Sequence, residues 1–151
     1  MINVKVDDSF ASEVDPSRLQ LAAQVTLEHQ GKYAEADLSI VITDDAQVQT
    51  LNQHFRGLNS STDVLSFPAD FIDPDTQKKY LGDVIISYPI CIDQAQSTNH
   101  SVDQELAVLV VHGVLHLMGY DHIHSKDRKI MWALQSDILE RLGFKDTKLP
   151  D

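Results

Sequence analysis

The chain is poor in cysteine and has no long hydrophobic run. Cys91 is the only cysteine among its 151 residues, so no disulfide can form within the chain and a zinc site built from several thiolates is excluded. No segment approaches the roughly 18 apolar residues of a membrane-spanning helix. The N-terminal residues lack the basic start and apolar core of a signal peptide, so we expect a cytoplasmic protein with no membrane partner.

Positive charge is also scarce. The 12 lysines and arginines are outnumbered by 23 aspartates and glutamates, giving a formal net charge of -11. This charge opposes indiscriminate binding of nucleic acid, and no DNA partner is expected. The basic residues nevertheless gather locally: Lys126, Arg128 and Lys129 lie together, Lys78–Lys79 are adjacent in a polar segment, and Arg56 precedes a glycine.

Histidine is where the sequence is most informative. His112 and His116 are four residues apart, so on a helix both side chains project from the same face. Gly119 can end that helix in a left-handed conformation, after which the chain can fold back and bring His122 to the pair. Three neutral imidazoles leave a tetrahedral ion one open position, which is typical of a catalytic rather than a structural site. We therefore predict that these three histidines bind one metal ion.

The residues around the pair support this prediction. The segment 106–118 is apolar on every side, as expected of a helix buried at the centre of a domain. Burying an imidazole without a partner costs roughly 2 to 7 kcal/mol. Each histidine taken alone is explained by a hydrogen bond to a backbone carbonyl, but the whole pattern favours a metal. One Zn²⁺ is the expected ion, while copper, iron, nickel or another divalent metal can occupy such a site in a purified sample.

The spacing His-x-x-x-His-x-x-Gly-x-x-His resembles that of the metzincin metalloproteases. In those enzymes the second position of the motif is a glutamate that acts as general base, whereas this chain has Gly113 there. A zinc-bound water would still have a lowered pKa, but the usual proton acceptor is absent from the motif. Peptide hydrolysis by the standard route is therefore disfavoured.

The remaining periodicity predicts a single α+β domain over residues 1–151, with a tail at 145–151. Four strands are expected, over 2–6, 38–42, 63–67 (stopped by Pro68) and 83–87. About five helices are expected: 16–29 capped by Asp15, a helix capped by Thr43 and ending near Gly57, 88–96, the central helix from Ser101 or Asp103, and a last helix capped by Ser125 and closed by Gly143. Helices between strands favour parallel pairing, and the close third and fourth strands favour an antiparallel pair, so we expect a small mixed, zincin-like sheet packed on the central helix.

Three segments resemble one known family. These are Arg56-Gly57 followed by Thr62-Asp63-Val64-Leu65-Ser66-Phe67-Pro68, then Leu81-Gly82-Asp83-Val84-Ile85-Ile86-Ser87, and the run His112 to His122. Together they closely resemble the YbeY family of bacterial rRNA-maturation endoribonucleases, in order, from about Leu51 to His122. The family commonly has a basic residue and a proline where this chain has Ser60-Ser61.

The resemblance implies a zinc-dependent, single-strand-specific endoribonuclease that matures the 3′ end of 16S rRNA and serves ribosome quality control. Its expected partners are single-stranded RNA, rRNA and ribosomal particles. The matched metal ligands are His112, His116 and His122, and Arg56 matches the family's functionally important arginine. Chemically, the guanidinium of Arg56 suits bidentate binding of a phosphate; an ordinary interaction with a helix C-terminus is the simpler explanation.

The sequence does not identify the general base. Asp63 and Asp83 are candidates for that role or for orienting a liganding imidazole, although each also suits a turn or strand end. His54 and His124 are further possible proton carriers. Two other functions stay open: a metalloprotease-like hydrolase with an unusual base, and a ribosome-assembly binding factor in which the metal is structural.

Overall fold

The computed structural model describes residues 1–144, in which the N-terminal alternation of apolar residues forms the first strand of a four-stranded sheet. Along the chain the elements are β1 (Ile2–Val6), the short 3-10 helix η1 (Asp8–Phe10), α1 (Pro16–Gln30), β2 (Asp37–Thr43), α2 (Asp45–Arg56), β3 (Val64–Ile72), β4 (Lys79–Ser87), α3 (Tyr88–Thr98), α4 (Val102–Leu117) and α5 (Ser125–Arg141). The described part of the chain confirms the single α+β domain. The proposed tail at 145–151 lies outside it.

The strand order is β1-β2-β4-β3, which the sequence alone did not reveal. β1, β2 and β4 run parallel, and β3 pairs antiparallel with β4, so the predicted mixture of pairings is confirmed. This order makes β3 an edge strand. One side of β3 is therefore free to border a binding site.

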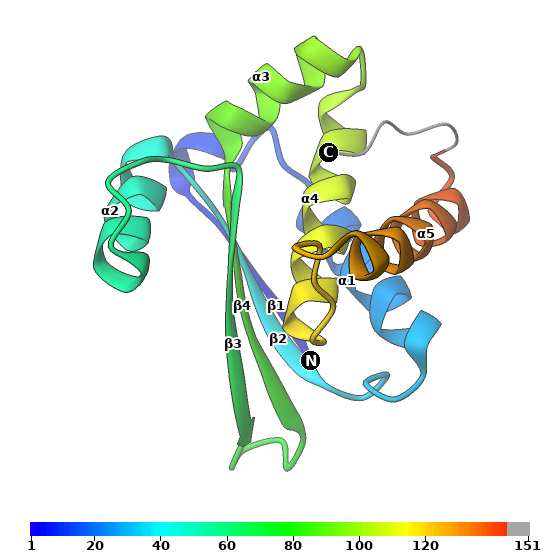
Figure 1. The fold of residues 1–151 in the computed structure, drawn as a ribbon. Helices are drawn as coiled ribbons and strands as arrows, with labels where there is room; N and C mark the ends of the chain where they lie inside the picture. Colours follow the sequence, from blue (N-terminus) through cyan, green and yellow to red (C-terminus); the bar gives the residue numbers. More distant parts are fainter. Residues whose placement is uncertain (145–151) are drawn as a thin grey trace.

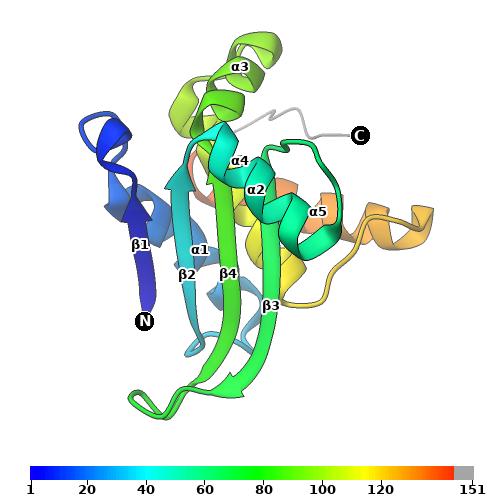
Figure 2. The same cartoon turned by 90° about the vertical axis from the view of Figure 1, so that its left-hand side faces the viewer.

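The helices cover the sheet unequally. Figures 1 and 2 show α1, α4 and α5 on one face and α2 on the other, with α3 at one end of the sheet. The central helix α4 contacts both β3 and β4 and also α1, α3 and α5. Its residues from Glu105 to Leu115 are all buried, which explains why its sequence is apolar on every side. Cys91 is buried in the same core.

Pro68 does not end its strand, contrary to the sequence prediction. β3 continues to Ile72, and Pro68 pairs with Gly82 of β4, which the sequence placed before its strand. A proline is tolerated here because an edge strand leaves some N–H groups without a partner in the sheet. The glycine opposite is required, since a Cβ at Gly82 would lie 2.2 Å from the carbonyl oxygen of Phe67.

Two predicted helix caps are also wrong. Thr43 is the last residue of β2, and α2 is capped by Asp44, whose carboxylate accepts the N–H of Gln47 at 2.8 Å. Ser125 is the first residue of α5, and the residue before it, His124, makes no capping hydrogen bond with its side chain. α2 therefore begins one residue later than predicted, because Thr43 still pairs with Ser87 in the sheet, and α5 begins one residue earlier than predicted. The predicted caps Asp15 and Ser101 are confirmed.

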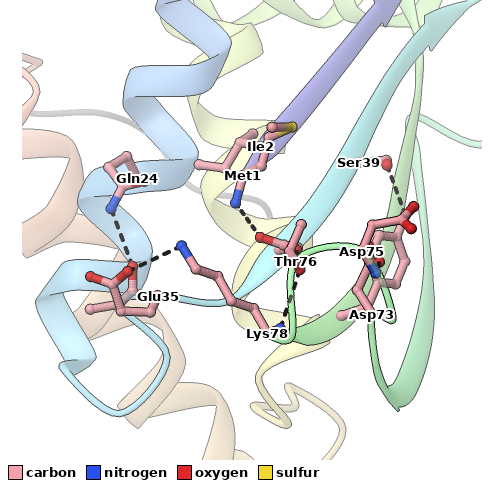
Figure 3. A network of polar contacts seen from close by, with 12 residues as sticks. Met1, Ile2, Gln24, Glu35, Ser39, Asp73, Asp75, Thr76 and Lys78 are labelled. Carbon is pink, nitrogen blue, oxygen red and sulfur yellow. Dashed lines mark hydrogen bonds and ion pairs between the residues drawn. The ribbon is translucent and has the colours of Figure 1, made fainter.

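The β3–β4 hairpin is tied to the start of the chain by a polar network (Figure 3). The carboxylate of Asp37, which is only 2% exposed, pairs with the N-terminal amino group and accepts the hydroxyl of Thr76 at 2.6 Å. Lys78 pairs with Glu35 at 3.3 Å. These contacts fix the end of the sheet opposite α3. None of the helices in residues 1–144 has the length and apolarity needed to cross a membrane.

Candidate functional site

His112 and His116 lie on the last turns of α4, and their side chains converge as the four-residue spacing predicts. Their Nε2 atoms are 3.1 Å apart. Two imidazole nitrogens on one tetrahedral zinc ion, each at about 2.0 to 2.1 Å from the metal, are about 3.3 Å apart. The pair is therefore already at the separation that a shared metal ion requires.

The turn after α4 delivers the third histidine. Gly119 adopts a φ of 100°, and the N–H of Tyr120 reaches back to the carbonyl of Leu115 at 3.1 Å, which ends the helix as predicted. The carboxylate of Asp121 then accepts the N–H groups of His122 and Ile123 at 2.6 and 3.1 Å. This tight turn directs His122 back toward α4.

The three imidazoles form one cluster. Each of them has a ring nitrogen within 4.8 Å of those of the other two. Burial, reinforced by the neighbouring His116 imidazole, lowers the pKa of His112 to about 4, and burial also lowers the pKa of His116. Both are therefore neutral near pH 7, the form in which histidine binds metals. The number and spacing of the three donors, and the neutral state of His112 and His116, fit a divalent metal ion.

The cluster lines a cavity of about 500 Å³ between the end of α4 and the edge strand β3. Arg56, at the end of α2, lines the same cavity although it is far from the histidines in sequence. So do Asp63 and Asp121. The fold thus brings together the predicted arginine, the predicted ligands and two carboxylates.

Gly113 occupies the place of the metzincin glutamate because no side chain fits there. A Cβ on Gly113 would lie 2.6 Å from Cγ1 of Val84 on β4, and its carbonyl accepts the hydroxyl of Ser66 at 3.2 Å. The motif position faces the sheet rather than the cavity. A general base at this position of the motif is therefore excluded.

The structure separates the other candidate bases. Asp63 lines the cavity; its carboxylate accepts the N–H of Val64 at 2.8 Å and the amide of Gln94 at 3.2 Å. Asp83 is outside the cavity and is engaged by the hydroxyl of Tyr80. His54 and His124 do not line the cavity either.

Two clusters of basic residues stand out in the sequence, and the structure distinguishes them. Lys126, Arg128 and Lys129 are exposed in the first turns of α5, directly after the loop that carries His122. Lys79 is the first residue of β4 and Lys78 precedes it. Lys78 pairs with Glu35, and Lys79 pairs with Asp70. Only the first group is therefore near the histidine cluster in the chain and free of ion pairs among the described residues.

The unusual Ser60-Ser61 segment is held in a defined conformation. The side-chain amide of Asn52, a buried residue of α2, donates to the carbonyl of Ser60 at 2.8 Å. The hydroxyl of Ser61 donates to the carboxylate of Asp45 at 2.7 Å. These bonds attach the loop before β3 to α2, the helix that carries Arg56.

Sequence reasoning missed two neighbours of the histidines. Gln135 of α5 is fully buried, and its Oε1 lies 2.6 Å from Nδ1 of His112. Trp132 of the same helix packs its ring 5.9 Å from that of His112 and 5.7 Å from that of His122. A polar residue on the apolar stripe of α5 was the available signal for Gln135.

Comparison with known proteins gives a consistent result. The profile of the family described as Endoribonuclease YbeY matches residues 4–143. The Endoribonuclease YbeY of Roseiflexus castenholzii is 43% identical over 149 residues, covering 95% of this chain and 94% of the relative, and that of Ligilactobacillus salivarius is 37% identical over 150 residues, covering 89% and 94%. The solution structure of TM1509 from Thermotoga maritima superposes with a TM-score of 0.66 at 26% identity, covering 94% of this chain and 89% of the other. The chain therefore belongs to the YbeY endoribonuclease family.

Proposed function

We propose that the domain, residues 1–151, is a zinc-dependent endoribonuclease that cleaves single-stranded RNA. The observation that carries the proposal is the convergence of three imidazoles and Arg56 on one cavity. The family and its named relatives support phosphodiester hydrolysis in RNA as the reaction. His112, His116 and His122 are the proposed ligands of one ion, and their donor set suits zinc, with nickel or another divalent metal able to replace it.

The chain's own residues supply the remaining chemistry. When bound, zinc supplies a water of lowered pKa and a Lewis acid for phosphate oxygens. Arg56 is exposed and, within residues 1–144, forms no ion pair, so its guanidinium is free to hold a phosphate through two parallel hydrogen bonds. Asp63 and Asp121 are the carboxylates of the cavity and the candidates to accept a proton there.

Two features near the cavity suit a single-stranded polyanion. Phe55 is adjacent to Arg56 in the chain, and 62% of its surface is exposed. Its ring contacts the rings of His54 and Phe67, with distances between ring centroids of 4.6 and 5.2 Å. An unpaired base can stack on such a ring, whereas a base inside a duplex cannot. The three basic residues of α5 add local positive charge to an acidic protein, although cations at a helix N-terminus oppose the helix dipole.

Membership of the family supports a finer proposal about the biological substrate. We infer that the natural target is the 3′ end of 16S rRNA, within ribosomal particles in the cytoplasm, and that the activity serves ribosome maturation and quality control. The net charge of -11 is consistent with a nuclease that needs such a particle or partner to concentrate its substrate. DNA is not expected as a substrate.

The alternative functions are distinguished by specific features. A metalloprotease-like hydrolase lacks its usual base, and Gly113 cannot be replaced by one without displacing Val84. An assembly factor with a structural metal would need the three histidines only to fasten the 119–122 turn to α4. That alternative predicts RNA or ribosome binding without cleavage.

The test is cleavage of a labelled single-stranded RNA, alone and within ribosomal particles. The samples are the wild-type protein, metal-stripped protein with and without added zinc, and the variants Arg56→Ala and His116→Ala. Arg18→Ala serves as a matched control, because Arg18 is an exposed arginine outside this cavity. Circular dichroism checks the folding of every variant.

Cleavage that depends on zinc, persists in Arg18→Ala and disappears in Arg56→Ala and His116→Ala would support the proposal. Equal cleavage in all samples would identify a contaminating nuclease and contradict it. No cleavage even with ribosomal particles, together with metal-dependent binding to them, would favour the assembly factor.

A further inference from the structure

We infer that Gln135 is a positioning residue that fixes the tautomer of His112, so that Nε2 of this histidine is presented to the metal. The inference rests on the proposed metal site but concerns a residue outside the set of ligands. Gln135 belongs to α5, 23 residues beyond His112 in the chain, and the two side chains meet in the core between α4 and α5.

The contact itself sets the direction of the hydrogen bond. Oε1 of Gln135 lies 2.6 Å from Nδ1 of His112. A carbonyl oxygen can only accept, so Nδ1 must carry the hydrogen. In a neutral imidazole the other nitrogen, Nε2, then keeps its lone pair free. Nε2 is also the atom that lies 3.1 Å from Nε2 of His116, on the side of the cluster where the ligand atoms converge.

The position of Gln135 is otherwise unfavourable. Its side chain is fully buried, and its amide nitrogen has no hydrogen-bond partner among the described residues. Leaving a buried donor unpaired costs stability, and a methionine or leucine would fill the same space without that cost. A role limited to packing does not account for a glutamine here, whereas the need for an acceptor at Nδ1 of His112 does.

The general chemistry of histidine ligands agrees with this assignment. A histidine that binds metal through one nitrogen usually donates its other N–H to an oxygen, which fixes ring orientation and tautomer. Loss of such a partner typically weakens metal binding about 10- to 100-fold. The neighbouring Trp132 packs on the same histidine ring but offers no acceptor, so Gln135 alone among these two residues of α5 can select the tautomer.

The test compares Gln135→Met, which keeps the length but loses the acceptor, with Gln135→Glu, which keeps an acceptor. Ile138→Val is the control for a changed core contact, because Ile138 is fully buried one turn further along α5. Two readouts are used. The ¹⁵N chemical shifts of the His112 ring in metal-free protein report the tautomer, and competition with a chromophoric chelator reports zinc affinity. Circular dichroism and urea unfolding verify that each variant folds.

The expected result is a single Nδ1–H tautomer of His112 in the wild-type, Gln135→Glu and Ile138→Val proteins, and a mixture or the other tautomer in Gln135→Met. Zinc affinity should fall about 10- to 100-fold in Gln135→Met only, even if that variant is as stable as the wild type. An unchanged tautomer and unchanged zinc affinity in Gln135→Met would overturn the inference. If the wild type binds no zinc, the proposed metal site fails, and the tautomer in metal-free Gln135→Met still decides whether Gln135 positions His112.

Discussion

Gly113 of α4 and Val84 of β4 are in such close contact that a single added carbon would overlap. The Cβ of any other residue at position 113 would lie 2.6 Å from Cγ1 and 3.1 Å from Cγ2 of Val84. The absence of a side chain is what lets the helix that carries His112 and His116 approach the sheet. The same contact leaves no room for the glutamate that metzincin metalloproteases carry at this position of the motif.

Gly113→Ala is therefore expected to destabilise the protein although alanine favours helices. The gain in helix propensity is about 1 kcal/mol, and the cost of overpacking a rigid valine is about 1 to 3 kcal/mol. The free energy of unfolding should therefore fall by up to about 2 kcal/mol in urea titrations. In a Val84→Ala background the same substitution should cost much less. An equal cost in both backgrounds would show that Val84 is not the obstacle.

The stability of the metal-free protein should decrease as the pH falls from 6.5 toward 4. His112 has a pKa of about 4 in the folded protein against 6.5 in the unfolded chain, so the unfolded state binds more protons in this window. The difference corresponds to roughly 3 kcal/mol for this one histidine. Urea unfolding at several pH values measures the effect. His112→Gln should flatten the curve, and exposed His54→Gln should not; identical curves for wild type and His112→Gln would refute the assignment.

Asp121 is expected to control metal affinity through the turn that it stabilises. Although partial desolvation opposes the shift, the N–H groups of His122 and Ile123 lower the pKa of its carboxyl. Asp121→Ala removes the acceptor for both groups and should weaken zinc binding by about ten-fold, as measured by chelator competition. Asp121→Asn keeps an acceptor oxygen and should bind zinc nearly as well as the wild type. Equal losses in the two variants would point instead to the charge of Asp121.

The basic residues at the start of α5 are expected to contact RNA phosphates. Replacing Lys126, Arg128 and Lys129 with alanine should lower the salt dependence of single-stranded RNA binding by about 2 in log–log slope, at about 0.7 per contact. The free energy of unfolding should rise by roughly a few tenths of a kcal/mol, because the positive charges that oppose the helix dipole at the N-terminus of α5 are removed. Metal-free protein prevents cleavage during the titration. The control replaces Lys78 and Lys79, which already pair with carboxylates, with alanine. The same change in slope in this control would show that the basic residues of α5 have no special role in RNA binding.

Phe55 is expected to contribute to the preference for single strands. Loss of one stacked base costs about 1 to 3 kcal/mol, so Phe55→Ala should weaken single-stranded RNA binding roughly 5- to 150-fold while duplex binding changes little. Phe55→Trp should retain the affinity. Phe71→Ala is the matched control, because Phe71 is 51% exposed but stacks on Tyr80 in the distant part of the hairpin. Equal effects of Phe55→Ala on the two forms of RNA would remove the stacking explanation.

Much of the secondary structure could be predicted because its causes are local. Alternation of apolar residues located the strands, and Asp15 and Ser101 marked the starts of their helices through side-chain caps. The errors have tertiary causes. Pro68 remains within β3 only because β3 lies at the edge of the sheet, a fact that depends on the strand order.

The candidate site divides in the same way. By itself the sequence determined the histidine pair and its turn, since a four-residue spacing places two side chains on one helical face and Gly119 permits the reversal toward His122. Only the tertiary structure placed Arg56 and Asp63 in the cavity, excluded Asp83 and brought Gln135 to His112. Backbone geometry over a few residues is set by local sterics and hydrogen bonds, whereas contacts between α2, β3, α4 and α5 depend on how whole elements pack.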